Sequence, residues 1–131
     1  MSDRNTPFRD GELFPVPIAA NTEIFGGHIV SGNAAGNAVL ASAVATQVTL
    51  GVSDGYVDNS TGAAGDALAL VRRGKSWCFA NFGGDAVTQA DVGKNCYVAD
   101  SQTVAKTDNS GARPIAGKVM IVDADGVWVL I

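Results

Sequence analysis

The sequence predicts an all-β protein: a small β-barrel or β-sandwich of short antiparallel strands, with an extended N-terminal arm and one short helical turn. Short β-branched and aromatic runs alternate with turn-forming clusters along most of the chain. Glycine accounts for 16 of the 131 residues, which suits a chain with many tight turns. Near the end, two apolar runs are joined by Asp125-Gly126, a typical hairpin sequence. The length fits one domain.

The balance of charge excludes some classes of partner. Hydrophobic residues make up 47% of the chain and charged residues 17%, so an oligomer or a docked subunit is one explanation and the many small residues are another. The net charge is −4, and Arg72-Arg73 with Lys75 is the main basic cluster. We expect no nucleic-acid partner, because such binding needs a larger positive footprint. A solvated turn between two strands is the preferred interpretation of this cluster, ahead of a contact with an acidic partner.

The segment 1–25 is predicted to be an extended arm, followed by a β-rich domain over 26–131. Residues 1–10 are polar, whereas 11–25 is apolar and contains Pro15 and Pro17. Proline lacks an amide donor and fixes φ, so this segment cannot be a helix or a central strand. An apolar segment without regular structure is expected to lie along another surface.

From Gly26 onward the pattern is one of short strands separated by Gly-, Asn- and Asp-rich turns. One helical turn is expected at Thr88–Asp91, which resembles a capping box, with Gly93 as its stop. The stretch 41–45 fits either helix or strand. The predicted strands are His28–Val30, Ala38–Leu40, Val48–Val52, Leu68–Val71, Lys75–Ala80, Cys96–Val98, Thr103–Lys106, Ile115–Val122 and Gly126–Ile131.

Two further patterns concern how these strands are organised. The closing run from Trp128 to Ile131 is strongly apolar, so we expect that strand to be buried in a sheet of the same chain or against a partner. The order of elements in 28–58 is echoed in 96–123: Asn37-Ala38-Val39 is matched by Thr103-Val104-Ala105, for example. The echo fits either two copies of a small β-unit or the alternation of strands and turns that any all-β protein shows.

The start of the chain and its two cysteines indicate a reducing compartment. The sequence opens on polar residues without the apolar core of a signal peptide, and no apolar run approaches the ~20 residues of a transmembrane helix. We therefore expect no membrane partner. Cys78 and Cys96 are predicted to be reduced, buried small hydrophobes.

No catalytic, cofactor or metal site is predicted. His28 is the only histidine, and a structural role in a strand or interface is favoured over a catalytic base. Asp123-Ala124-Asp125-Gly126 opens like a calcium loop but runs directly into a β-run, which favours a hairpin turn. Trp77 and Trp128 lie in β-runs, where packing in the core or an interface is favoured over stacking on a ligand.

Four segments, in order, resemble the small head-decoration (capsid cement) proteins of tailed bacteriophages. The resemblance covers nearly the whole chain beyond residue 10, and each motif by itself has low specificity. The segments are Phe14-Pro15-Val16 through Ile29-Val30 to Asn33-Ala34-Ala35-Gly36; Leu50-Gly51-Val52 with Tyr56-Val57-Asp58-Asn59 and Gly65-Asp66; Arg72-Arg73-Gly74 before an aromatic strand; and Ala112 to Val119 before the Asp-Gly hairpin.

The resemblance implies a structural virion protein rather than an enzyme. It implies a subunit, often a homotrimer, on the exterior of the capsid, with the host cytoplasm as the place of assembly. The major capsid protein would be its partner, and an N-terminal arm would lie on that protein. The apolar residues of the arm are the expected contacts, because apolar and aromatic groups dominate such interfaces. They are Phe14, Pro15, Val16, Pro17, Ile18, Ile24 and Phe25.

Two other classes remain open at this stage. One is a tail or baseplate adaptor, or a carbohydrate-binding virion module that uses Trp77 or Trp128. The other, less favoured, is a trimeric all-β hydrolase with sites between subunits. The first requires an exposed aromatic platform, and the second requires clustered inward carboxylates or a nucleophile motif.

Overall fold

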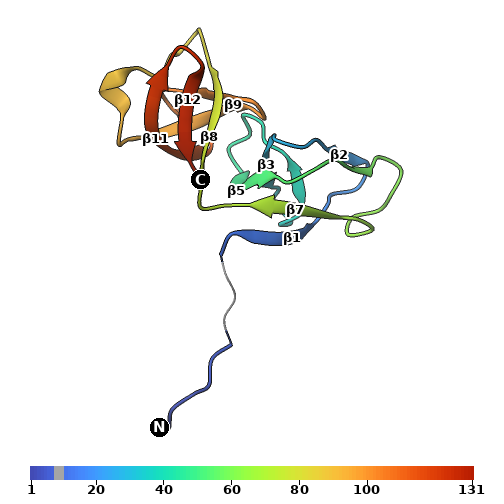
Figure 1. Ribbon diagram of the computed structural model, residues 1–131. Helices are drawn as coiled ribbons and strands as arrows, with labels where there is room; N and C mark the ends of the chain where they lie inside the picture. The colour runs from blue at the N-terminus through green and yellow to red at the C-terminus, as the bar shows by residue number, and fades with distance from the viewer. Residues whose placement is uncertain (8–10) are drawn as a thin grey trace.

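Alternating apolar runs and tight turns produce an almost entirely β structure with one short helical turn, which confirms the predicted fold class. The computed structural model describes residues 1–7 and 11–131 (Figure 1). Its elements are β1 (Leu13–Pro17), β2 (Thr22–Ile24), β3 (Ile29–Gly32), β4 (Ala38–Leu40), β5 (Val48–Ser53), β6 (Val57–Asn59), β7 (Leu68–Arg72), β8 (Ser76–Asn81), η1 (Gln89–Asp91), β9 (Asn95–Asp100), β10 (Thr103–Ala105), β11 (Ile115–Asp123) and β12 (Gly126–Leu130).

The chain forms two lobes in succession, seen in Figure 1 as a blue-to-green and a yellow-to-red half. The N-terminal lobe (residues 11–72) holds a five-stranded sheet of order β1-β7-β5-β3-β4, with β2 and β6 as a separate pair. The C-terminal lobe (residues 76–131) is a closed barrel of order β10-β8-β12-β11-β9. The predicted turn at Arg72-Arg73-Gly74-Lys75 is the connection between the lobes, and Gly74 there has a φ of 82°.

The two lobes are copies of one topology. Val30 pairs with Gly51 in the first lobe, and Cys96 pairs with Gly117 in the second. Each of these positions in β9 and β11 is 66 residues beyond its counterpart in β3 and β5. The β4 and β10 ladders follow the same shift. The echo in the sequence therefore reflects two copies of a β-unit.

The strands that close each unit also correspond. The antiparallel pair β1 and β7 in the first lobe corresponds to the antiparallel pair β8 and β12 in the second. Each pair has the same register relative to its neighbouring strand, which is β5 in the first lobe and β11 in the second. In the barrel, Asn81, the last residue of β8, pairs in parallel with Val104 of β10. In the N-terminal lobe the equivalent contact is a single parallel bridge from Ile18 to Ala38. One copy is thus a closed barrel, whereas the other is closed by one bridge.

A shared core joins the lobes. The N-terminal core contains Ile18, Ile24, Val30, Ala38, Ala69 and Val71. The core of the barrel is extended by Ile29, Ala41 and Val52, which belong to the N-terminal lobe. The equivalent positions on the C-terminal lobe are Asn95, Thr107 and Lys118, all exposed. The same face is therefore apolar where it meets the other lobe and polar where it meets water.

Most sequence predictions of local structure are confirmed. All nine predicted strands are present with small shifts at their ends, and the expected turn is the 3-10 helix η1, in which the Asp91 carboxylate accepts the Thr88 N–H. The closing strand β12 lies between β8 and β11, so it is buried within its own chain. Residues 41–45 form a loop, neither helix nor strand.

Three predictions are corrected. The hairpin is present, but Asp123 pairs with Gly126, so the two residues of its loop are Ala124-Asp125 rather than Asp125-Gly126. The predicted arm ends earlier than residue 25, because β1 and β2 pair within the N-terminal lobe. The boundary between the two folded units lies at 73–75 instead. The pairing of β6 was also missed, because Asp58-Asn59 resembles a turn.

Candidate docking surfaces

Strand β1 lies at the edge of the N-terminal sheet, and its prolines limit what can pair with it. Ile18 N–H donates to the Ala67 carbonyl (2.9 Å), which fixes the alternation along the ladder. Pro15 and Pro17 therefore occupy positions whose nitrogens face away from β7. The free edge lacks two amide donors, and a partner strand could not complete its ladder there. The sequence argument that this segment cannot be a central strand is confirmed.

Side chains on the outward side of β1 and β7 form an apolar surface, which we call the β1/β7 outer face. Leu13, Leu68 and Leu70 are 47%, 53% and 43% exposed. The register places Pro15 opposite Leu70 and Pro17 opposite Leu68, so all five side chains share one side of the ladder. Exposed apolar side chains gathered on a regular sheet surface are typical of an interaction site.

The structure divides the seven predicted contact residues into three groups. Pro15 and Pro17 lie on the β1/β7 outer face, and Phe25 is exposed elsewhere. Ile18 and Ile24 are fully buried in the N-terminal core, so their prediction as partner contacts is wrong: hydrophobicity alone did not reveal that this segment folds back. The remaining two, Phe14 and Val16, are half-buried and line an apolar pocket.

Sequence reasoning missed the leucines of β7. Leu68 and Leu70 alternate with Ala69 and Val71 in a run that is apolar on both sides of the strand. The period of two separates the faces but does not tell which face is buried when both are apolar. The alternation of Pro15 and Pro17 in β1 was the available clue, because edge prolines identify that strand's register.

Phe25 belongs to an aromatic cluster next to the junction between the lobes. Its ring centroid lies 5.4 Å from that of Tyr56 and 5.7 Å from that of His28. The His28 Nδ1 in turn lies 2.9 Å from Ser101 Oγ, and the Ile29 N–H donates to the Ser101 carbonyl at 2.8 Å. The Ser–His contact therefore ties the first lobe to the β9–β10 turn of the second.

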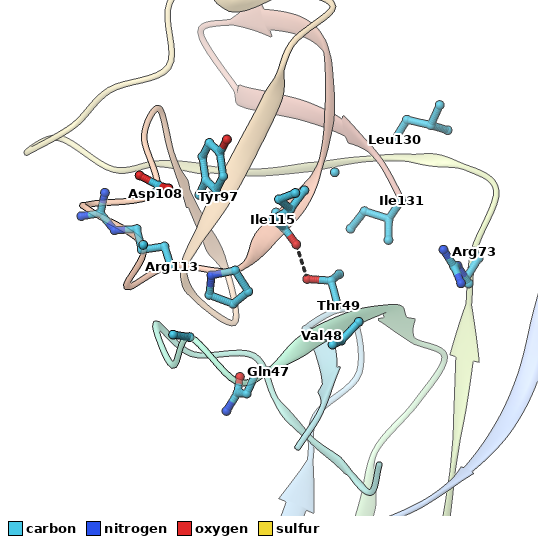
Figure 2. A pocket seen from close by; sticks show the side chains of 15 residues that line it. Gln47, Val48, Thr49, Arg73, Tyr97, Asp108, Arg113, Ile115, Leu130 and Ile131 are labelled. Carbon is cyan, nitrogen blue, oxygen red and sulfur yellow. Dashed lines mark hydrogen bonds between the residues drawn. The ribbon is translucent and has the colours of Figure 1, made fainter. Parts of the chain in front are cut away.

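A groove of about 650 Å³ runs between the lobes (Figure 2). Thr49 and Ile115 lie on opposite sides of it, and the Thr49 hydroxyl donates to the Ile115 carbonyl at 2.6 Å. Arg73 stands near its end beside Ile131. The groove is lined by both lobes, so its shape depends on their relative position.

A polar clamp holds the loop after β10 on one side of this groove. The Arg113 guanidinium donates to the Asp85 carboxylate at 2.9 Å and lies over the ring of Phe82, 5.1 Å from its centroid. The Thr107 hydroxyl also donates to Asp85. The hydrogen bonds from Thr107, with the charge of Arg113, hold the pKa of Asp85 below its usual value.

A separate apolar pocket of about 320 Å³ opens into the N-terminal lobe. Its walls come from β1, β5 and β7, and Arg73 stands at its rim. The lining residues are Phe14, Pro15, Val16, Leu50, Val71 and Arg73.

The other candidate side chains of the sequence have structural surroundings. Trp77 and Trp128 are both half-buried; Trp77 packs against the core of the barrel, and the indole N–H of Trp128 donates to Asp123 at 3.1 Å. Both cysteines are free thiols, and burial raises the pKa of Cys96 to about 12. Over residues 1–7 and 11–131, no three metal-ligating side chains converge. Within the same ranges, no helix has the length and apolarity needed to cross a membrane.

Comparison with family models, curated proteins and solved structures finds no match to this chain.

Proposed function

We propose that this chain is a structural virion protein that binds the outside of an assembled phage head as an oligomer and stabilises contacts between major capsid subunits. The β1/β7 outer face is the observation that carries the proposal. It is apolar, exposed and built on a regular two-stranded ladder, and its free edge is blocked against strand addition by Pro15 and Pro17. Such a surface favours docking by its face onto a partner's surface.

The N-terminal segment supports the same role, although the part of it that can act as an arm is shorter than we expected from the sequence. Residues 1–7 are exposed and extend away from both lobes (Figure 1). A tail that extends away from its own subunit is suited to reach a neighbouring protein. Because β1 begins at Leu13, the arm of this proposal is the segment before it rather than the whole of 1–25.

The proposed stabilisation is mechanical. A subunit that bridges neighbouring capsid proteins adds contacts that exist only in the assembled lattice, and mass action then favours that state. A specific interface buries about 1,200–2,000 Å². Several such contacts within one oligomer multiply by avidity, so each can be weak.

Binding to heads tests the proposal directly. The full chain, with its oligomeric state measured by light scattering, is co-sedimented with expanded, undecorated heads of its phage. Saturable binding near one chain per capsid subunit is expected. The double variant Leu68→Asp with Leu70→Asp should lose most of this binding. Val44→Asp is the matched control, because Val44 is an equally exposed apolar residue (46%) on a loop outside the face.

Absence of any binding to heads would contradict the proposal and favour the tail-adaptor or carbohydrate-binding alternatives. If heads are bound, undiminished binding of the double aspartate variant would exclude the β1/β7 outer face as the contact surface. Deletion of residues 1–10 without effect would exclude the arm. The half-exposed Trp128 is the residue on which the carbohydrate alternative depends, and Trp128→Ala tests it against immobilised glycans.

A further inference from the structure

Because the two lobes share their ladder registers, their interiors can be compared position by position. Phe14 pairs with Val71 in β7, and Trp77 pairs with Val129 in β12. Two residues further along the same strands, Val16 corresponds to Phe79. At both positions the inward side chain is smaller in the N-terminal lobe.

The residue that follows the last strand of each unit, Arg73 after β7 and Ile131 after β12, differs as well. The Arg73 N–H donates to the Glu12 carbonyl as the Ile131 N–H donates to the Lys75 carbonyl, so Arg73 corresponds to Ile131. In the C-terminal lobe, Trp77 and Ile131 pack against the core. In the N-terminal lobe the corresponding space is the pocket of about 320 Å³. Leu50, which replaces Ala116, fills only part of it.

We propose that this pocket binds a peptide segment of a partner protein that carries an aromatic or branched aliphatic side chain next to a carboxylate. The apolar walls from Phe14, Val16 and Val71 fit the side chain, because the second copy of the fold fills the same space with Trp77 and Ile131. Burying such a side chain in a concave apolar site is favourable, and a few polar groups at its rim set the specificity.

Arg73 supplies the preference for a carboxylate. Among the described residues its guanidinium lies within 4.0 Å of no carboxylate oxygen, whereas Arg72 and Arg113 each have an acidic partner. Arg73 stands at the rim of both the pocket and the groove between the lobes. A segment entering from the groove would therefore bring its carboxylate past this cation. The inference does not depend on the capsid proposal, and either can fail without the other.

A titration followed by nuclear magnetic resonance tests the pocket in the full chain. The ¹⁵N-labelled protein is titrated with N-acetyl-L-tryptophan, and separately with the neutral N-acetyl-L-tryptophanamide. We expect saturable shifts at the amides of Leu50 and Val71, with a dissociation constant on the order of 1 mM for so small a probe. The neutral probe should bind about two- to fivefold more weakly, because an exposed ion pair is lost. Arg73→Gln should remove that difference.

Val16→Phe introduces the side chain that Phe79 provides at the equivalent position of the other lobe, and so fills part of the pocket. It should weaken binding of the charged probe at least about tenfold. Met120→Ala, which shortens a comparably exposed apolar side chain (43%) on the C-terminal lobe, is the control and should leave the titration unchanged. If Val16→Phe loses the dispersed spectrum of a folded protein, Arg73→Gln still tests the site, because its side chain is on the surface.

The absence of saturable shifts, or shifts unaltered in a folded Val16→Phe variant, would overturn the proposal. Tenfold tighter probe binding after deletion of residues 1–10 would identify the chain's own N-terminal segment as the occupant. Self-association that Val16→Phe abolishes would identify a second copy. Either of the last two results would overturn the assignment to a partner protein.

Discussion

Gly51 and Gly117 occupy the same place in the two copies of the fold. A Cβ on Gly51 would lie 2.2 Å from the Arg72 carbonyl oxygen, and one on Gly117 would lie 2.3 Å from the Leu130 carbonyl oxygen. In each lobe the residue after the glycine pairs with the residue that carries this carbonyl: Val52 pairs with Arg72, and Lys118 pairs with Leu130. The two lobes thus require a missing side chain at one equivalent point, where neighbouring backbones approach closely.

We predict that Gly51→Ala and Gly117→Ala each destabilise the protein by about 1–3 kcal/mol, because the added methyl group must push two paired strands apart. Urea unfolding followed by circular dichroism measures the effect. Gly55→Ala is the control, since a Cβ there meets no atom within 4 Å. Equal midpoints for all three variants would contradict the close approach.

The sequence contained much of this fold but only part of the candidate site. Turn clusters and β-runs located nine strands, whereas the echo of 28–58 in 96–123 fitted either a repeat or an ordinary succession of strands and turns. The pairing of β1 with β7 could not be predicted, because Pro15 and Pro17 exclude a central strand without distinguishing an edge strand from a free arm. For the same reason Ile18 and Ile24 were expected at a partner surface. Which apolar side chains are buried is decided by contacts distant in sequence, and hydrophobicity alone does not record them.

The prolines of β1 give a second prediction. Replacing both Pro15 and Pro17 by Val restores two amide donors on the free edge of the sheet and leaves it open to another strand. We expect the double variant to self-associate in a concentration-dependent way, and more strongly than the natural sequence. Sedimentation velocity over a range of concentrations measures this. Pro7→Val, in the exposed segment before the first strand, should behave like the unaltered protein.

The junction between the lobes gives a third prediction, with a control supplied by the repeat itself. Ile29 is fully buried in the core that both lobes share, whereas its counterpart Asn95 is exposed. Ile29→Ala should therefore destabilise the protein by about 2–5 kcal/mol, through lost burial and the cavity left behind. Asn95→Ala should change stability by no more than about 0.5 kcal/mol. Similar midpoints in urea for the two variants would mean that the lobes do not rely on this contact.

The pH dependence of stability gives the last prediction, through Asp91 in the turn η1. Its carboxylate accepts hydrogen bonds from the Thr88 N–H at 2.8 Å and from the Thr88 hydroxyl at 3.1 Å. The backbone bond is the main cause that lowers the pKa of Asp91, and Lys106 and Lys94 add to it. A lowered pKa means that the ionised carboxylate stabilises the folded state. That contribution is complete above the usual pKa of an aspartate, about 3.9, and is lost as the pH falls through the lower value in the folded protein.

Asp91→Asn should therefore be less stable than the unaltered protein at pH 7, and the difference should shrink as the pH falls below about 4. Urea midpoints measured at several values between pH 7 and pH 2.5 test this. Asp3→Asn is the control, because Asp3 lies in the exposed N-terminal segment, and its midpoints should follow those of the unaltered protein. A difference between Asp91→Asn and the unaltered protein that stays constant down to pH 2.5 would show that the carboxylate charge does not stabilise this turn.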